Sequence, residues 1–327
     1  MKGAALRLGI VLLLTVGSMV WVFWNFEWQE AEKSLTGVSW DWVPAALAFY
    51  SLAHALRALR FHLLLQGKVP AMQGLSILSV GYLAIHVVPA RIGEFVRPYL
   101  LAERAGVSWG AALAVIVLER LADMLMLLAM LLGVALWVEL PSGALVVWDT
   151  DILLAGQRVI GVATGVGFVG LAVVLALGER ALRLTDPLPG GALARRFVEA
   201  VRGQKPQVLV AVLALSAAIW AVTVLGVWWV LRAFPGMPAE LDQAFALWTI
   251  TLTGMTVLPT AGFFGAYEAA CSSVLMVFGV QEDAAKAFAV LLHLSQYFFT
   301  LGVGFWFLVR EGWSLRELVA RSQESRS

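Results

Sequence analysis

The chain has 327 residues, of which 61% are hydrophobic and only 14% charged, and its mean hydropathy is +0.84. A soluble globular protein carries about 25% charged residues, so this composition excludes that class and predicts an integral membrane protein. The net charge of +1 is too small for a nucleic-acid-binding domain, and a single cysteine, Cys271, excludes both a disulfide framework and a cysteine-based metal site. We expect Cys271 to be a small packed residue.

Six apolar runs are long enough to cross a bilayer, for which a helix needs about 20 residues. The first run follows Lys2 and Arg7, and no small-residue cleavage site comes after it. We therefore expect an uncleaved first helix and not a secretion signal. The six runs cover residues 8–26, 43–65, 109–138, 152–177, 207–231 and 284–309.

Two shorter apolar runs, 75–88 and 243–258, each lead into a stretch broken by proline and glycine. A helix of 14 residues extends over only about 21 Å, less than the ~30 Å hydrocarbon core. We expect residues 75–105 and 243–279 to be hairpins that enter the membrane and return to the same side, with full crossings as the alternative. The expected hinge residues, which remove a backbone donor or permit a turn, are Pro89, Gly93, Pro259, Gly262 and Gly265.

Lysine and arginine are unevenly distributed between these runs. If the N-terminus is cytoplasmic, 18 of the 23 fall on the cytoplasmic side, whereas the outer intervals are acidic. Both termini are therefore predicted to be cytoplasmic, in a cell inner membrane. Residues 178–206 are a basic cytoplasmic loop, in which "GGALARRFVEAVRG" is either a short helix on the anionic inner leaflet or an ordinary loop. Residues 310–327 are a cytoplasmic tail.

The two halves of the sequence are related at a constant offset of 173 residues. Residues 106–118 match residues 279–291 at seven of thirteen positions, and "VVPARIGEFVRPY" corresponds to "VLPTAGFFGAYEA". Three crossings in each half make the second half inverted relative to the first. We therefore predict one all-α, polytopic transmembrane domain over residues 1–327, with about six full spans and two re-entrant or short-helix hairpins. Its inverted repeats cover about residues 5–138 and 152–309, an arrangement typical of secondary transporters.

Charged residues occur at membrane depth in the first hairpin and in the span that follows it. Each such residue at a helix centre raises the free energy of insertion by about 2.5–3.5 kcal/mol. Glu119 and Asp123 are four residues apart and share a helix face. We expect a polar groove that binds a charged group, with a structural ion-paired cluster or extension to the inner surface as the alternative. The candidate substrate-binding residues are Arg91, Glu94, Arg97, Glu119, Arg120, Asp123 and Glu268.

Three further polar residues have simpler interpretations. Arg57 and Arg60 lie near the inner end of their span and are expected to extend to lipid phosphates. His293 lies where the second repeat aligns with Glu119 and its neighbours, and hydrogen-bonded packing is favoured over a proton relay. No HExxH motif, metal-ligand cluster, nucleophile arrangement or ATP-binding loop is found in the sequence, so we expect no metal, no cofactor and no enzyme activity.

Three motifs in this order carry a resemblance to a known family: "PARIGEFVR" at 89–97, "ERLAD" at 119–123 and "LPTAGFFGAYE" at 258–268. They resemble the flippase-like membrane proteins that include the transmembrane region of lysylphosphatidylglycerol synthases, and the resemblance extends over about residues 5–310. It implies movement of a polar-headed lipid between leaflets, and the family's polar positions correspond to the seven candidates above. The last motif lacks the more usual Pro-Gly pair.

The sequence thus predicts a transporter that moves a polar-headed lipid between leaflets and is not itself driven by ATP. The resemblance implies a phospholipid, an aminoacylated lipid, a hopanoid or a polyprenyl-linked lipid as substrate. No transferase domain follows the last span, so we expect translocation without lipid synthesis. A secondary transporter of a small soluble solute is the alternative, and a lipid-modifying membrane enzyme is a weaker one. Anionic inner-leaflet lipids are expected partners, and nucleic acid is not.

Overall fold

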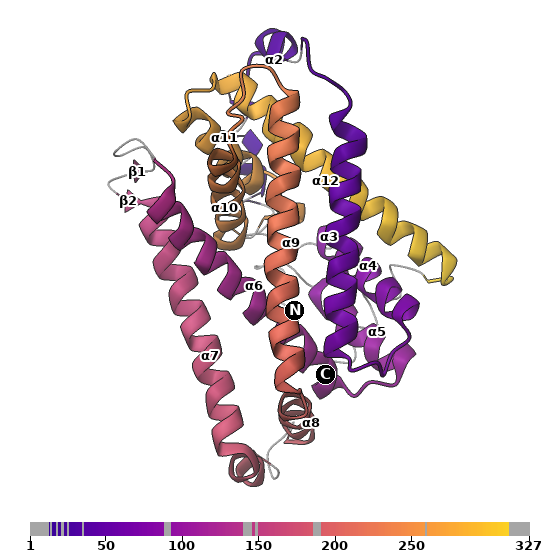
Figure 1. Cartoon of the computed structure of the whole chain (residues 1–327). Coiled ribbons are helices and arrows are strands. Elements are labelled where there is room, and N and C mark those ends of the chain that lie inside the picture. The colour runs from indigo at the N-terminus through magenta and orange to yellow at the C-terminus, as the bar shows by residue number, and fades with distance from the viewer. Residues whose placement is uncertain are drawn as a thin grey trace.

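The computed structural model in Figure 1 is almost entirely helical. It describes residues 13, 15–17, 19, 20, 23, 24, 26–34, 36–87, 93–139, 146, 147, 150–185, 191–258 and 260–313. Apart from a two-residue antiparallel pairing of β1 (Val146–Val147) with β2 (Thr150–Asp151), the regular structure of these residues is helix. The all-α prediction is therefore confirmed for this part of the chain. Most of the first predicted span, the end of the tail, Pro89, Arg91 and Pro259 lie outside the described residues.

The long helices coincide with the apolar runs. Two of them, α9 and α12, are long and apolar enough by length and composition to cross a bilayer, among the residues searched. Most helix ends fall within two residues of the ends of the runs, because length and hydropathy are properties of the local sequence. The long helices are α3 (Trp42–Leu64), α6 (Trp109–Trp137), α7 (Ile152–Thr185), α9 (Pro206–Ala233) and α12 (Glu282–Arg310).

Each of the two predicted hairpins consists of two short helices. The first contains α4 (Ala71–Val87) and α5 (Val96–Ala105), and the second contains α10 (Leu241–Val257), the 3₁₀ turn η2 (Ala261–Phe263) and α11 (Ala266–Val277). The two helices of each pair contact each other. Helices of 10 and 12 residues extend over only about 15–18 Å, so neither α5 nor α11 spans a hydrocarbon core of ~30 Å. The return of each pair to the same side of the membrane stays a prediction.

Glycines at the breaks permit conformations that other residues resist. A Cβ on Gly93 would lie 2.3 Å from the backbone carbonyl of Ala84, so the first break packs directly on the backbone of α4. In the second break Gly262 has φ +59° and Gly265 has φ +84°, both in the left-handed region. These three predicted hinge glycines therefore lie where the backbone turns or makes close contact.

The elements of the two halves correspond in detail. Both α6 and α12 have 29 residues, and each is preceded by a glycine of positive φ, Gly106 at +63° and Gly279 at +86°. Each helix also begins at an N-cap side chain, Ser108 or Gln281, that accepts a hydrogen bond from the backbone N–H three residues on. All of these positions differ by 173 residues.

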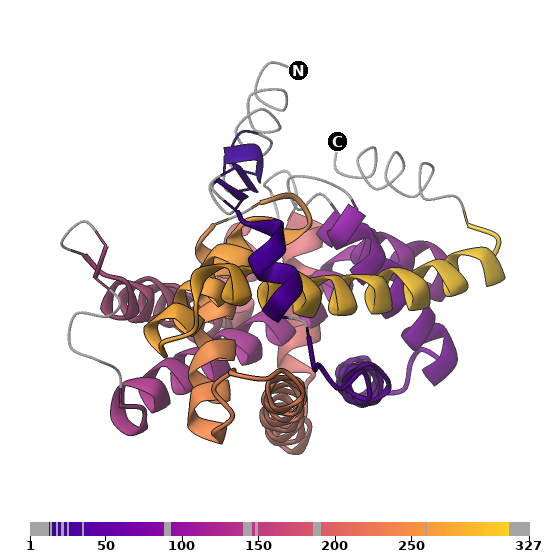
Figure 2. The ribbon, with the colours of Figure 1, turned by 90° about the horizontal axis from the view of Figure 1, so that it is seen from above.

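Contacts between the halves follow the same correspondence. The short helix α4 contacts α12, and α10 contacts α6, so each broken pair packs against the last long helix of the other half. Helices α3 and α9 lie side by side, and α12 is steeply inclined to both (Figure 2). The amphipathic segment of the basic loop forms α8 (Gly191–Arg202), which contacts α6. In the other half, the short helix α2 (Trp28–Ser34) contacts α12.

The described residues form two large hydrophobic cores and a small third cluster of Leu127, Leu131 and Ile160. One joins α9–α12 to the first half of α3, as far as Tyr50, and includes the buried Cys271. The other joins α4–α6 to the second half of α3, from Phe61 onward. Tyr50 and Trp248 of the first core line the cavity described below, as does Tyr82, which packs against the second core.

Candidate functional site

Four buried charged side chains from α3, α5 and α6 form an ion-paired cluster. Arg60 lies with Nη1 2.6 Å from Asp123 Oδ1 and Nη2 3.2 Å from Asp123 Oδ2, and it donates to Ser216 Oγ at 2.8 Å. Arg97 Nη2 is 2.5 Å from Glu119 Oε2, and Arg60 Nη2 is 3.7 Å from the other Glu119 oxygen. Their exposed fractions are 1% for Arg60 and Arg97, 0% for Glu119 and 9% for Asp123. We call these four residues the fixed cluster.

The fixed cluster is balanced in charge and fitted closely into its surroundings. Two guanidinium groups face two carboxylates, which is the condition under which buried charges are tolerated. The Arg97 guanidinium lies over the Phe61 ring at 4.7 Å, and a Cβ on Gly81 would lie only 2.0 Å from Arg97 Cγ. The cluster therefore joins α3, α5, α6 and, through Ser216, α9.

The expectation that Arg60 extends to lipid phosphates is wrong. Its guanidinium is buried because Glu119 and Asp123 share a face of α6 and need cations that α6 does not supply on that face. Arg120, about 100° round the helix, is 4.0 Å from Asp123 and its side chain is 42% exposed. The sequence showed that Glu119 and Asp123 have no cation on their own helix face. It did not show which other helix supplies that cation.

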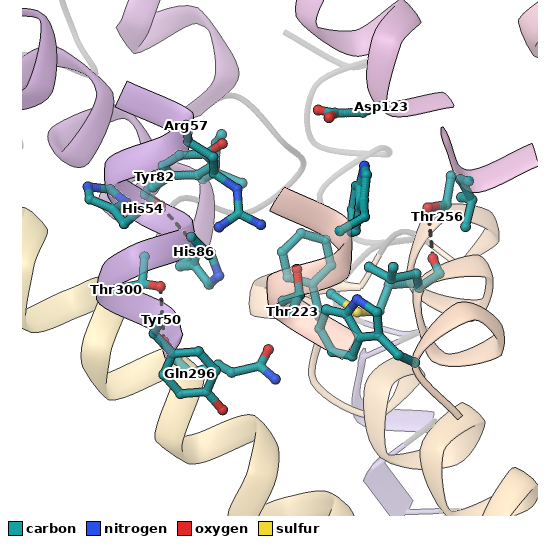
Figure 3. A pocket seen from close by; sticks show the side chains of 18 of the residues that line it. Tyr50, His54, Arg57, Tyr82, His86, Asp123, Thr223, Thr256, Gln296 and Thr300 are labelled. Carbon is teal, nitrogen blue, oxygen red and sulfur yellow. Dashed lines mark hydrogen bonds between the residues drawn. The ribbon is translucent and has the colours of Figure 1, made fainter. Parts of the chain in front are cut away.

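Beside the fixed cluster lies a cavity of about 360 Å³. Residues of α3, α4, α6, α9, α10 and α12 line it, together with Glu94 and Phe263 from the two breaks. Figure 3 shows Arg57, His54 and His86 on one side, and Asp123 and Thr256 on the other. Most of the remaining lining is apolar or aromatic, including Tyr82, Met124, Trp220, Trp248, Met255 and Phe299.

Three charged side chains of the lining are available to a ligand. The side chains of Arg57 and Glu94 have no hydrogen bond or ion pair with any other residue that the structure describes, and the Arg120 side chain has only its long contact with Asp123. Asp123 also lines the cavity, but both of its carboxylate oxygens accept from Arg60. The cavity thus offers two guanidinium groups and one carboxylate.

A second buried polar pair lies in the other half of the molecule. Glu268, at the start of α11, is 2% exposed, and its Oε1 is 2.6 Å from Nδ1 of His293 on α12. Its Oε2 accepts the backbone N–H of Gly265 at 2.6 Å. The His293 ring stacks on Tyr267 with ring centres 4.3 Å apart. His293 therefore has the hydrogen-bonded packing that we expected. Its partner is Glu268, a carboxylate for which the sequence indicated no partner.

The structure separates the candidate residues into three groups. Glu94, Arg120 and Asp123 line the cavity, and Asp123 is also part of the fixed cluster. Arg97 and Glu119 lie buried in that cluster away from the lining, and Glu268 lies apart from both. The lining also contains residues that sequence reasoning did not select, notably His54, Tyr82, His86 and Gln296. A polar residue on a mostly apolar helix carries no local sign of the direction in which it points. Substrate binding by the candidates stays a prediction.

A bundle of long apolar helices and interrupted short ones, with charges held in its interior, defines an integral membrane protein. The chain belongs to the family described as the lysylphosphatidylglycerol synthase TM region, whose match covers residues 5–304. The resemblance carried by the three motifs is thereby confirmed. Nothing among curated proteins or solved structures matches the chain.

Proposed function

We propose that this protein moves a polar-headed lipid between the two leaflets of the membrane, as a transporter and not an enzyme. The observation that carries the proposal is the cavity, where Arg57, Arg120 and Glu94 are available in a largely apolar interior. Ionisable groups inside a membrane protein are energetically costly and commonly mark a substrate pathway. Membership of a lipid-associated membrane family supports a lipid as the substrate.

The cavity has a size that suits a headgroup. Its volume of about 360 Å³ is near the lower end of the ~300–1,000 Å³ typical of ligand pockets, too small for a headgroup together with two acyl chains. The tails would remain in the bilayer while the headgroup crosses. Arg57 and Arg120 are suited to a phosphate, because guanidinium groups form strong charge-assisted bonds to phosphate oxygens. Glu94 is suited to a cationic group on the same headgroup.

We further propose that the two halves are inverted repeats, over about residues 5–138 and 152–309. Two observations support this arrangement. Helices α6 and α12 are offset by 173 residues, and each broken pair packs against the last long helix of the other half. Glu94 and Phe263, one from each break, both line the cavity, and non-helical backbone at membrane depth is tolerated where it lines such a space. Rocking of one half against the other would then open the cavity to each side in turn.

The same proposal places the protein in an inner membrane with both termini cytoplasmic. In the proposed arrangement the protein has about six full spans and two re-entrant or short-helix pairs, α4 with α5 and α10 with α11. The basic helix α8 would then lie at the cytoplasmic surface, where exposed Arg195, Arg196 and Arg202 meet anionic lipids.

The test is the movement of fluorescent phospholipids in liposomes that contain the purified protein, measured by dithionite quenching of the outer leaflet. We expect wild type to move at least one headgroup class, and Arg120→Gln and Glu94→Gln to slow it by about tenfold or more. Lys68→Gln is the matched control, because that side chain is exposed after the end of α3, away from the cavity. If wild type moves none of a broad headgroup panel, with or without a pH gradient, the proposal fails and the solute transporter becomes the better account.

A further inference from the structure

The fixed cluster and the pair of Glu268 with His293 differ in the kind of cation that each contains. In the fixed cluster both carboxylates face guanidinium groups, which keep their proton at any pH at which the protein is folded. Glu268 instead faces an imidazole, the side chain that changes charge near neutral pH. No lysine or arginine that the structure describes lies within ion-pairing distance of Glu268. The second pair therefore contains a side chain of the type that changes charge near neutral pH, whereas the cations of the fixed cluster are guanidinium groups.

Because Glu268 and His293 are buried, the favoured charge state of the pair depends on whether the pair is exposed to water. Glu268 and His293 are each 2% exposed, and both oxygens of Glu268 are already bonded, to His293 Nδ1 and to the Gly265 N–H. With one proton between the two side chains, the pair has no net charge. Without that proton, a carboxylate would remain unbalanced in an apolar interior, which is strongly unfavourable. Burial of the pair therefore favours the state without net charge, and exposure of the pair to water would remove that preference.

Among the residues that the structure describes, the surroundings of the pair supply no other balancing charge. The titratable side chains that face it from α3, α4, α11 and α12 are Tyr50, His86, Tyr267, Cys271, Lys286 and Tyr297. Tyrosine and cysteine are neutral near pH 7, and Lys286, two helical turns before His293, is paired with Glu282 at 2.6 Å. α10 contributes Trp248, which has no charge, against Tyr267. His86 is the other side chain of this set that changes charge near neutral pH, and its Nδ1 is 2.8 Å from the Tyr82 carbonyl.

A short chain of contacts connects the pair to the cavity. The Tyr267 ring stacks on His293, and its hydroxyl accepts a hydrogen bond from Gln296 Nε2 at 3.0 Å. Gln296 lines the cavity. The Phe264 ring is 4.9 Å from the His293 ring, and its neighbour Phe263 also lines the cavity. A headgroup that forms a hydrogen bond with the Gln296 amide would therefore disturb the Gln296–Tyr267 bond, and with it the Tyr267 ring that covers His293.

We propose that Glu268 and His293 form a proton-binding site, connected to the cavity through Tyr267 and Gln296, that couples lipid movement to a proton gradient. The coupling rests on the proposed transport function. One proton is bound while the pair is covered and released when it opens to water, so protonation and the direction of lipid movement become linked. The inference gives Glu268 a role other than direct contact with a headgroup.

Histidine NMR tests the proton site without any transport. The chain has four histidines, so a ¹⁵N-histidine-labelled sample in lipid nanodiscs gives few signals, and His293→Gln identifies the one of interest. We expect the His293 signal to change protonation state between pH 5 and 9, and Glu268→Gln to shift or abolish that change. His62→Gln, outside the pair and the cavity lining, is the matched control. A His293 signal that keeps one protonation state throughout overturns the proposal.

Transport under imposed pH gradients tests the coupling. We expect the rate of lipid movement by wild type to differ several-fold between inward and outward gradients, and Glu268→Gln and His293→Gln to remove that difference. Glu103→Gln, which removes an exposed carboxylate on α5, should behave as wild type. Equal rates in both gradients for wild type overturn the coupling even if lipid moves. If wild type moves no lipid at all, the transport function fails, and the NMR titration alone decides whether the proton site exists.

Discussion

Replacement of Arg60 by methionine is expected to destabilise the protein by about 3–5 kcal/mol, the range for removing one partner of a buried ion pair. Methionine retains much of the length and apolar volume of arginine but has no charge. The guanidinium is 1% exposed and bonds both oxygens of Asp123 and Ser216 Oγ. Without it, Asp123 would have only the 4.0 Å contact with Arg120, and Glu119 only Arg97.

A double-mutant cycle separates the ion pair from a simple loss of packing. Asp123→Asn removes the facing charge, so the pair Arg60→Met and Asp123→Asn should lose less stability than the sum of the single changes. We expect a coupling energy of about 1–3 kcal/mol, the range for residues in direct contact. The measurement is denaturant titration of the purified protein in micelles, followed by the fluorescence of its 14 tryptophans.

The control is Arg202→Met, an exposed arginine on α8 whose loss should change the free energy of unfolding by no more than about 0.5 kcal/mol. If Arg60→Met also stays within that limit, Arg60 is not buried in the fixed cluster. It would then extend to the lipid phosphates, as its position near the end of the span suggested.

Two further predictions concern helix contact and the cavity. Gly304→Ala should destabilise the protein by about 1–3 kcal/mol in the same titration, because the new Cβ would lie 2.5 Å from Leu83 Cβ on α4. Gly302→Ala in the same helix has no neighbour within 4 Å and should be neutral or slightly stabilising, and equal losses for both would contradict this packing. Arg57→Gln should leave stability unchanged but slow dithionite-detected lipid movement by about tenfold, since this guanidinium lines the cavity without an ion-pair partner among the described residues. Unchanged transport would exclude Arg57 from the headgroup site.

The positions of the helices and breaks were predictable because their causes are local. The apolar run of residues 109–138 became α6 at Trp109–Trp137, since Ser108 is a capping residue and most of the run is apolar. The breaks near Gly93 and Gly262 were likewise predictable from proline and glycine, which act on the backbone at their own positions.

The partners of the buried charges were not predictable, because they depend on which helix faces meet. Arg60 and Asp123 are 63 residues apart, and nothing in "ALRALRF" indicates that one arginine lines the cavity while the other is buried. Glu268 and His293 are 25 residues apart on different helices, and they meet because α11 packs against α12. The sequence showed that these carboxylates needed partners, and the packing of the helices decided which ones they have.

The location of a bound headgroup tests the central claim most directly. The probe is a phospholipid with a photoreactive diazirine in its headgroup, compared with the same lipid carrying the diazirine at the end of one acyl chain. After illumination in liposomes, the labelled residues are mapped by mass spectrometry. The account predicts that the headgroup probe labels cavity residues such as Met124 and Trp220, while the acyl probe labels the outer helix surface, for example Phe305 and Trp306. If both probes label only the outer surface, the headgroup does not enter the cavity and the account is contradicted.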